Sequence, residues 1–144
     1  MDVRAILKKK GDRVVTINPE ATIGETAQVL KREGIGALVV SDDSGAILGI
    51  VSERDIVGGL GDPKRRAGLL EAQVSALMTR DVVTCSPADQ VQKCMLLMTE
   101  HHIRHLPVTQ DGAMVGVVSI GDIVKSRLEE LESEAGFLRD MIAS

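Results

Sequence analysis

Residues 49–55 read Gly-Ile-Val-Ser-Glu-Arg-Asp, and residues 116–122 read Gly-Val-Val-Ser-Ile-Gly-Asp. Each copy is an apolar strand that runs into a Ser-x-x-Asp sequence and then into an apolar helical pattern. A strand that ends at a helix N-terminus leaves backbone N–H groups free for an anion, while Ser adds a hydroxyl and Asp adds an acceptor for a ribose diol. Ser-x-x-Asp is also close to an ordinary helix capping box, so the turn has a structural interpretation beside the ligand-binding one.

The repetition extends over most of the chain. With an offset of about 68 and one gap, about 16 of roughly 43 aligned positions are identical, which indicates an internal repeat. In each copy a β-branched strand, over residues 14–17 or 82–85, is followed by a helix that begins at a capping sequence, at Thr22 or Asp89. An apolar hairpin then leads to the strand-to-helix turn. Each copy therefore predicts a β-α-β-β-α unit.

The predicted fold class is mixed α/β (α+β), with two such repeats and a C-terminal helix. One unit buries little apolar surface by itself, so we expect the repeats to pack sheet to sheet about a pseudo-twofold axis. The expected organisation is a first repeat with an N-terminal leader helix in residues 1–61, a linker in 62–73, a second repeat in 74–126 and an amphipathic helix in 127–144.

The C-terminal helix carries a continuous apolar stripe. Its apolar residues recur three and four apart: Val124, Leu128, Leu131, Ala135, Leu138 and Ile142. Such a stripe has to be buried, either on its own domain or on another subunit.

The composition excludes several classes of function. Aromatic residues make up 1% of the chain and the formal net charge is −4, which argues against a nucleic-acid partner. No apolar run is long enough to cross a bilayer, so no membrane association is expected. Cys85 and Cys94 match no zinc spacing and make no disulfide framework, so we interpret them as reduced, buried thiols. The N-terminus lacks the pattern of a secretory signal, and a cytoplasmic location is expected.

The sequence offers weak candidates for metal-binding and catalytic residues. His101 and His105 are four apart, but the first helix of the second copy should end near His101 and a strand should follow from Ile103. The histidines then do not share one helix face, so no metal is expected. Nothing in the chain pairs a nucleophile with a base, so we expect a protein that is not an enzyme.

Taken together, these pieces resemble the tandem cystathionine-β-synthase (CBS) domain pair. The resemblance rests on the leaders in residues 3–11 and 74–81, the two Val-Val-Thr-x-x-Pro strands, Ile-Arg-His-Leu-Pro-Val in residues 103–108, and the two strand-to-helix turns. It implies a non-catalytic regulatory module that binds an adenine nucleotide such as AMP, ATP or NAD, or S-adenosylmethionine, in the cleft between the repeats. It also implies a homodimer. Because no effector domain is visible in the sequence, we expect control of an effector protein in trans.

The resemblance also implies roles for matching residues. In the second copy, Ser119 would bind phosphate and Asp122 the ribose hydroxyls, with the adenine held near Val83, Thr84, Ile103, Arg104, His105 and Pro107. The corresponding positions of the first copy are Val15, Thr16, Ile35, Gly36, Ala37, Ser52 and Asp55. Arg54 has Gly121 at its counterpart and would supply positive charge to a phosphate.

The two copies differ where the adenine would lie. Arg104, His105 and Pro107 of the second copy are replaced by Gly36, Ala37 and Val39 in the first. We therefore expect the first site either to bind more weakly or to hold a different part of a dinucleotide, with the well-formed adenine site in the second copy. Two alternatives stay open: a scaffold protein that keeps the fold without sensing nucleotide, and, with less support, an enzyme.

Overall fold

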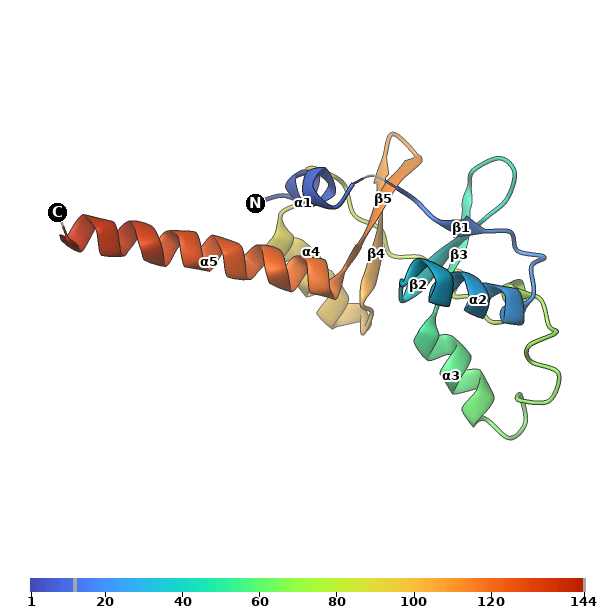
Figure 1. The fold of residues 1–144 in the computed structure, drawn as a ribbon. Coiled ribbons are helices and arrows are strands. Elements are labelled where there is room, and N and C mark those ends of the chain that lie inside the picture. Colours follow the sequence, from blue (N-terminus) through green and yellow to red (C-terminus); the bar gives the residue numbers. More distant parts are fainter. Residues whose placement is uncertain (12, 144) are drawn as a thin grey trace. The chain divides into compact units, whose positions relative to one another are not determined.

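The computed structural model describes residues 1–11 and 13–143 and divides the chain into two compact units (Figure 1). Unit 1 comprises Met1–Arg13 and Val83–Ser144, and unit 2 comprises Val14–Val82. The predicted mixed α/β class with a C-terminal helix is confirmed. The leader helix at the N-terminus belongs to the unit that holds the second repeat.

Unit 2 is built around a three-stranded sheet. Its elements are β1 (Thr16–Ile17), α2 (Ile23–Glu33), β2 (Ala37–Ser41), β3 (Ile47–Ser52), α3 (Glu53–Gly61) and the short 3₁₀ helix η1 (Val74–Ala76). The strand order is β1-β2-β3, with β1 parallel and β3 antiparallel to β2. Ile23, Leu38 and Val51 are fully buried, so the core is aliphatic as the composition predicts.

Local sequence signals set the ends of α2. The Thr22 hydroxyl accepts a hydrogen bond from the Glu25 backbone N–H at 3.0 Å, as the predicted capping sequence requires. Gly34 ends the helix in the left-handed conformation, with φ of 65°. His102 has the same conformation at the equivalent helix end of the second repeat, with φ of 54°.

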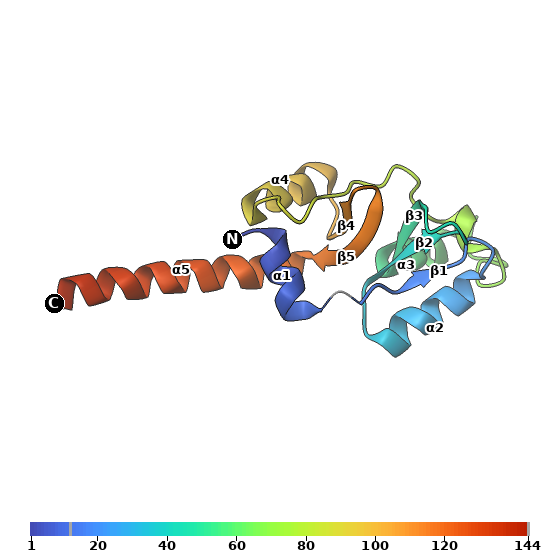
Figure 2. The same cartoon turned by 90° about the horizontal axis from the view of Figure 1, so that it is seen from above.

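Unit 1 has the same plan with a smaller sheet. Its elements are α1 (Val3–Lys10), α4 (Val91–His101), β4 (His105–Gln110), β5 (Ala113–Ser119) and α5 (Ile120–Ala143). Figure 2 shows α1 and α5 near the antiparallel β4–β5 hairpin, and both helices contact β5. The helix expected after Ser119 and the amphipathic helix expected in 127–144 are one continuous helix, α5.

Three predictions about local structure are wrong. The strand expected over residues 82–85 is a single bridge from Cys85 to Val108, because extending the parallel ladder would need a backbone N–H from Pro107. The strand expected over residues 14–17 is limited to β1. The helix expected to begin at Asp89 has Gln90 as its N-cap, since the Asp89 carboxylate accepts from the Ser86 backbone N–H at 2.8 Å instead.

Each leader packs on the repeat that it does not precede in sequence. In unit 1, the backbone N–H groups of Val3 and Arg4 donate to the carbonyls of Asp89 and Pro87, each at 2.9 Å. In unit 2, the N–H groups of Val74 and Ser75 donate to Ala21 and Pro19, the equivalent carbonyls, at 2.7 and 3.3 Å. The end of the segment expected to be a linker also joins unit 2, where Leu69 is buried.

One glycine in β3 and one in β5 accommodate the exchanged leaders. A Cβ on Gly116 would lie 2.6 Å from Cδ2 of Leu7 in α1. A Cβ on the equivalent Gly49 would lie 2.6 Å from Sδ of Met78 and 2.8 Å from the Thr79 carbonyl oxygen. The leaders therefore approach both strands too closely for any side chain.

Alanine at these glycines tests the leader packing. Gly49→Ala should lower the free energy of unfolding by about 2–3 kcal/mol, because the new methyl meets a backbone carbonyl that cannot rotate away. Gly116→Ala should cost about 1 kcal/mol, because only the mobile tip of Leu7 is in the way. Gly58→Ala is the control: nothing lies within 4 Å of its Cβ position in α3. It should stabilise by about 0.5–1 kcal/mol, and equal effects of all three in urea unfolding would contradict this packing.

Candidate functional site

Both Ser-x-x-Asp sequences form reciprocal helix caps. The Ser52 backbone N–H donates to Asp55 Oδ2 at 2.8 Å, and the Asp55 N–H donates to Ser52 Oγ at 3.3 Å. The same two bonds join Ser119 and Asp122 at 2.9 and 3.2 Å. All four side chains remain half-buried rather than enclosed in the core. Both Ser-x-x-Asp sequences therefore act as helix capping boxes, and their side chains remain partly exposed to solvent.

In unit 1, the candidate residues of the second repeat meet at one edge of the hairpin. The Ile120 N–H donates to the Arg104 carbonyl at 2.8 Å, and His105 is the register partner of Ser119. Ile103 precedes them and is partly buried against the core.

Val83 and Thr84 lead into the bridge beside β4. Cys85 donates its N–H to the carbonyl of Pro107 at 3.0 Å, which holds this segment against the strand. Pro107 is buried. Of the candidate binding residues of the second repeat, Thr84 and Arg104 are exposed.

In unit 2, the candidate residues of the first repeat have an equivalent arrangement. The Glu53 N–H donates to the Gly36 carbonyl at 2.9 Å, and Ala37 is the register partner of Ser52. Arg54 is exposed in the first turn of α3. The remaining candidates are Thr16, which is exposed in β1, and Val15 and Ile35, which are partly buried against the core.

Lys10 is a functional candidate that reasoning from the sequence missed. Its Nζ donates to Asp122 Oδ2 at 2.6 Å and to the Val117 carbonyl at 2.8 Å. Lys10 ends α1, so the exchange of leaders places its ammonium group at the N-terminus of α5. The local sequence associates Lys10 with the first repeat, and only the observed packing assigns it to the second.

The surroundings of Asp122 favour its ionised form. Burial alone would raise the pKa of this carboxyl, but hydrogen bonds from Lys10 and Ser119, with the positive charge of Lys10, hold the pKa below its usual value. A carboxylate, an ammonium group and the positive end of a helix dipole therefore lie together at this turn.

A groove of about 610 Å³ lies next to the turn in unit 1. Arg104, Ile120 and Gly121 line the end nearest the turn, and the groove continues along α5 past Val124 and Leu128. Its exposed surface is mostly apolar, and its charged lining residues are Arg104 near the turn and Lys125, Glu129 and Glu132 along α5. Ser119 and Asp122 are not among the residues that line it.

The remaining candidate functional features are the two cysteines, the possible metal ligands and the possible membrane spans. Cys85 and Cys94 are free, buried thiols, and their mutual hydrogen bond together with burial raises the pKa of Cys85. Among the described residues, no group of three or more His, Cys, Asp or Glu side chains is arranged to hold a metal ion. Within residues 1–11 and 13–143, no helix has the length and apolarity required to span a bilayer.

Comparison with known proteins identifies the repeated unit. The chain matches the family described as CBS domain over residues 3–62 and again over residues 74–129. The CBS domain-containing protein YhcV of Bacillus subtilis (strain 168) is 30% identical over 116 residues, which cover 81% of this chain and 80% of YhcV.

Solved structures agree with that match. The CBS-domain containing protein ATU1752 from Agrobacterium tumefaciens is 41% identical with a TM-score of 0.84, over 88% of this chain and 99% of that one. The CBS domain pair of protein MJ0100 is 28% identical with a TM-score of 0.77, over 92% of this chain and 98% of that one. It was solved in complex with 5′-methylthioadenosine and S-adenosyl-L-methionine.

Removing the charge of Lys10 tests the electrostatics of this turn. In Lys10→Met the pKa of Asp122 should rise, as measured by carboxyl NMR titration, while Lys8→Met on the same helix should leave it unchanged. Because the pKa of Asp122 is depressed in the folded state, the stabilisation by Lys10 is present above the unfolded-state pKa of about 3.9. It is lost as the pH falls through the folded-state pKa.

The corresponding stability difference should be small. The Lys10 side chain is 40% exposed, so its ion pair with Asp122 is screened by solvent. The free energy of unfolding of the wild type should therefore exceed that of Lys10→Met by only about 0.5 kcal/mol at neutral pH, and the two should be equal once Asp122 is protonated. A difference that persists in acid would assign the effect to packing of the lysine stem.

Proposed function

The chain belongs to the CBS domain family, and from that premise we propose that it is a non-catalytic regulatory module whose second repeat binds an adenine nucleotide. The observation that carries the proposal is the Ser119–Asp122 turn, where an anion-binding helix N-terminus lies beside Lys10 and Arg104. AMP, ATP or NAD has the phosphate and ribose that this turn would bind. S-adenosylmethionine belongs to the same ligand class and is one of the two ligands of the MJ0100 pair.

The helix cap leaves enough hydrogen-bonding capacity for a ligand. Ser119 Oγ accepts from the Asp122 N–H, which leaves its hydroxyl proton to donate to a phosphate oxygen. Asp122 uses Oδ2 for the cap and for Lys10, which leaves Oδ1 for ribose hydroxyls. Lys10 donates two of its three protons within the protein, which leaves one for a phosphate. Capping and ligand binding are therefore compatible.

Charge differences support the second repeat as the stronger site. In the alignment of the two leaders, Lys10 corresponds in sequence to Asp81, so the first repeat has no lysine at that position. Arg104 likewise corresponds to Gly36. A phosphate would thus meet Lys10 and Arg104 at the second repeat and, in the first turn of α3, Arg54 at the first repeat, a difference of one positive charge.

The proposed role is control of another protein. Ligand occupancy would favour one position of α5 over another and so change the affinity for an effector protein that acts in trans. We further propose that the protein is a homodimer. The two free thiols favour a reducing compartment such as the cytoplasm.

A scaffold protein without nucleotide sensing is the second candidate. The caps at Ser52 and Ser119 explain both Ser-x-x-Asp sequences without a ligand, and α5 exposes large apolar residues that suit an interaction surface. Ligand binding is the measurement that separates the two candidates.

A thermal-shift and calorimetric screen with AMP, ATP, NAD and S-adenosylmethionine tests the proposal. A ligand at a hundredfold its Kd adds about 2.7 kcal/mol, a shift in Tm of roughly 5–10 °C for a chain of this size. Asp122→Asn should weaken binding roughly 10- to 100-fold, since it removes the charge and keeps a capping side chain. The matched variant Asp55→Asn should change affinity less than about threefold. Equal losses in both variants would overturn the assignment to the second repeat, and binding of none of the ligands would favour the scaffold.

Comparing a charged with an uncharged ligand isolates the role of Lys10. Lys10→Met should weaken AMP binding roughly tenfold and leave 5′-methylthioadenosine unaffected, because only AMP presents a phosphate to the ammonium group. Isothermal titration of both ligands against Lys10→Met and Lys8→Met checks this. An equal loss for both ligands would mean that Lys10 acts through the fold and not on the phosphate.

A further inference from the structure

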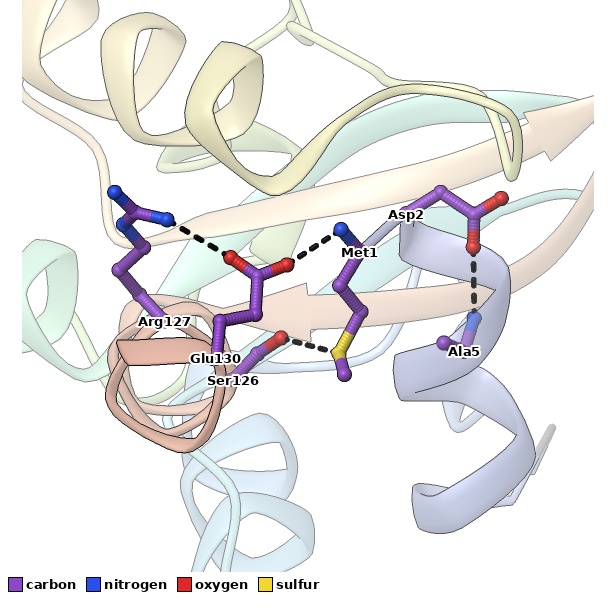
Figure 3. Close-up of polar contacts among 6 residues, drawn as sticks. All are labelled: Met1, Asp2, Ala5, Ser126, Arg127 and Glu130. Atoms are coloured by element: carbon purple, nitrogen blue, oxygen red, sulfur yellow. Dashed lines mark hydrogen bonds and ion pairs between the residues drawn. The ribbon is translucent and has the colours of Figure 1, made fainter. Parts of the chain in front are cut away.

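Helix α5 has two distinct faces. Ile123 is fully buried against its own unit and Ser126 is 4% exposed. Figure 3 shows that the Met1 amino group pairs with Glu130 on this inner side, where Ser126 Oγ also contacts Met1 Sδ. The apolar stripe lies on another face of the same helix and is uncovered in the chain itself.

The exposed residues of the stripe are large. Leu128 is 60% exposed, Leu131 44%, Leu138 53% and Ile142 86%. In Figures 1 and 2 the C-terminal part of α5 extends past α1 and α4, so its own unit leaves that part uncovered. An aliphatic face of this length has a large hydrophobic free energy to gain from a partner.

The spacing of the stripe is that of a coiled coil. With Gly121 added at its N-terminal end, the stripe alternates between steps of three and four over the seven positions 121, 124, 128, 131, 135, 138 and 142. We propose that this face binds the same face of a second copy of the chain, in antiparallel orientation, as a two-stranded coiled coil. The inference rests on the homodimer proposed above, and its argument does not use the nucleotide site.

Charge selects one antiparallel register. When Leu128 of one copy faces Leu131 of the other, the flanking charges meet as Lys125 with Glu132 and as Arg127 with Glu134, each pair twice by symmetry. Sliding one helix by seven residues in either direction instead brings like charges together, Glu132 with Glu132 or Lys125 with Lys125. Of these three registers, only the first matches opposite charges on both flanks.

Side-chain volume selects the same arrangement. In this register Gly121 faces Leu138, Val124 faces Ala135, and Leu128 faces Leu131, so the two smallest residues, Gly121 and Ala135, are each opposite a larger one. Gly121 lines the groove at the base of α5, and Leu138 of the second copy would pack against Gly121. A parallel pair would also match charges, but it would place Gly121 on Gly121 and Ala135 on Ala135 and leave voids at both layers.

A charge swap tests the orientation in the full-length chain. Lys125→Glu and Glu132→Lys should each weaken the dimer roughly tenfold, and the double variant should restore wild-type affinity because the pair is exchanged on both sides. In a parallel dimer Lys125 has no acidic partner, so the double variant would not be rescued. Sedimentation equilibrium at low salt measures each dissociation constant. Failure of the rescue would overturn the antiparallel register.

Charge on the stripe tests the surface itself. The double variant Leu131→Glu and Leu138→Glu should convert the dimer to a monomer, with more than about a hundredfold loss of affinity. The control, Ser133→Glu and Ala143→Glu, adds the same charge to α5 away from the stripe and should remain dimeric. Circular dichroism melts of both variants monitor folding.

The outcomes separate this inference from the homodimer itself. A wild-type chain that is monomeric at micromolar concentration would overturn both. A dimer that survives the stripe variant would retain the homodimer and overturn α5 as its interface.

Discussion

Both units depend on the backbone hydrogen bonds between a leader and the segment that precedes the first helix of a repeat, α4 in unit 1 and α2 in unit 2. Val3 and Val74 are fully buried where the leaders enter, and their N–H groups bind equivalent carbonyls, those of Asp89 and Ala21. Neither repeat, as a continuous stretch of sequence, contains the leader that covers its own hairpin. A buried backbone segment needs its polar groups satisfied, so each repeat is complete only with the exchanged leader in place.

The exchange has a consequence for the site. It brings the basic end of α1 to the N-terminus of α5, so Lys10 neutralises part of the charge of Asp122. A capping carboxylate alone would repel a phosphate at that helix end. With the ammonium group beside it, the same turn has an acceptor for hydroxyls and a donor for an anion. The asymmetry between Lys10 and Asp81 then follows from which leader covers which repeat.

The sequence predicted the fold well where the signals were local or repeated. The capping residues Thr22 and Ser52, the hairpins and the helix end at Gly34 all follow from neighbouring residues. The length of the strand before Pro87 could not be predicted from neighbouring residues, because it depends on the missing backbone N–H of Pro107 in another strand. The contribution of Lys10 to the site also depends on long-range packing. Local patterns cannot show which repeat a leader covers.

The continuity of α5 links the two surfaces proposed for this protein. Asp122 lies in its first turn, and Leu138 lies about four helical turns further along the same element. A single helix transmits a shift at its N-terminus along its whole length, whereas two helices joined by a loop would absorb it. A ligand would influence the dimer through this helix by favouring one position of α5 against its own unit, where Ile123 and Ser126 form the contact that would have to change. Because those two residues hold the inner face of the helix that carries both the cap and the stripe, they are the place where occupancy and assembly would be coupled.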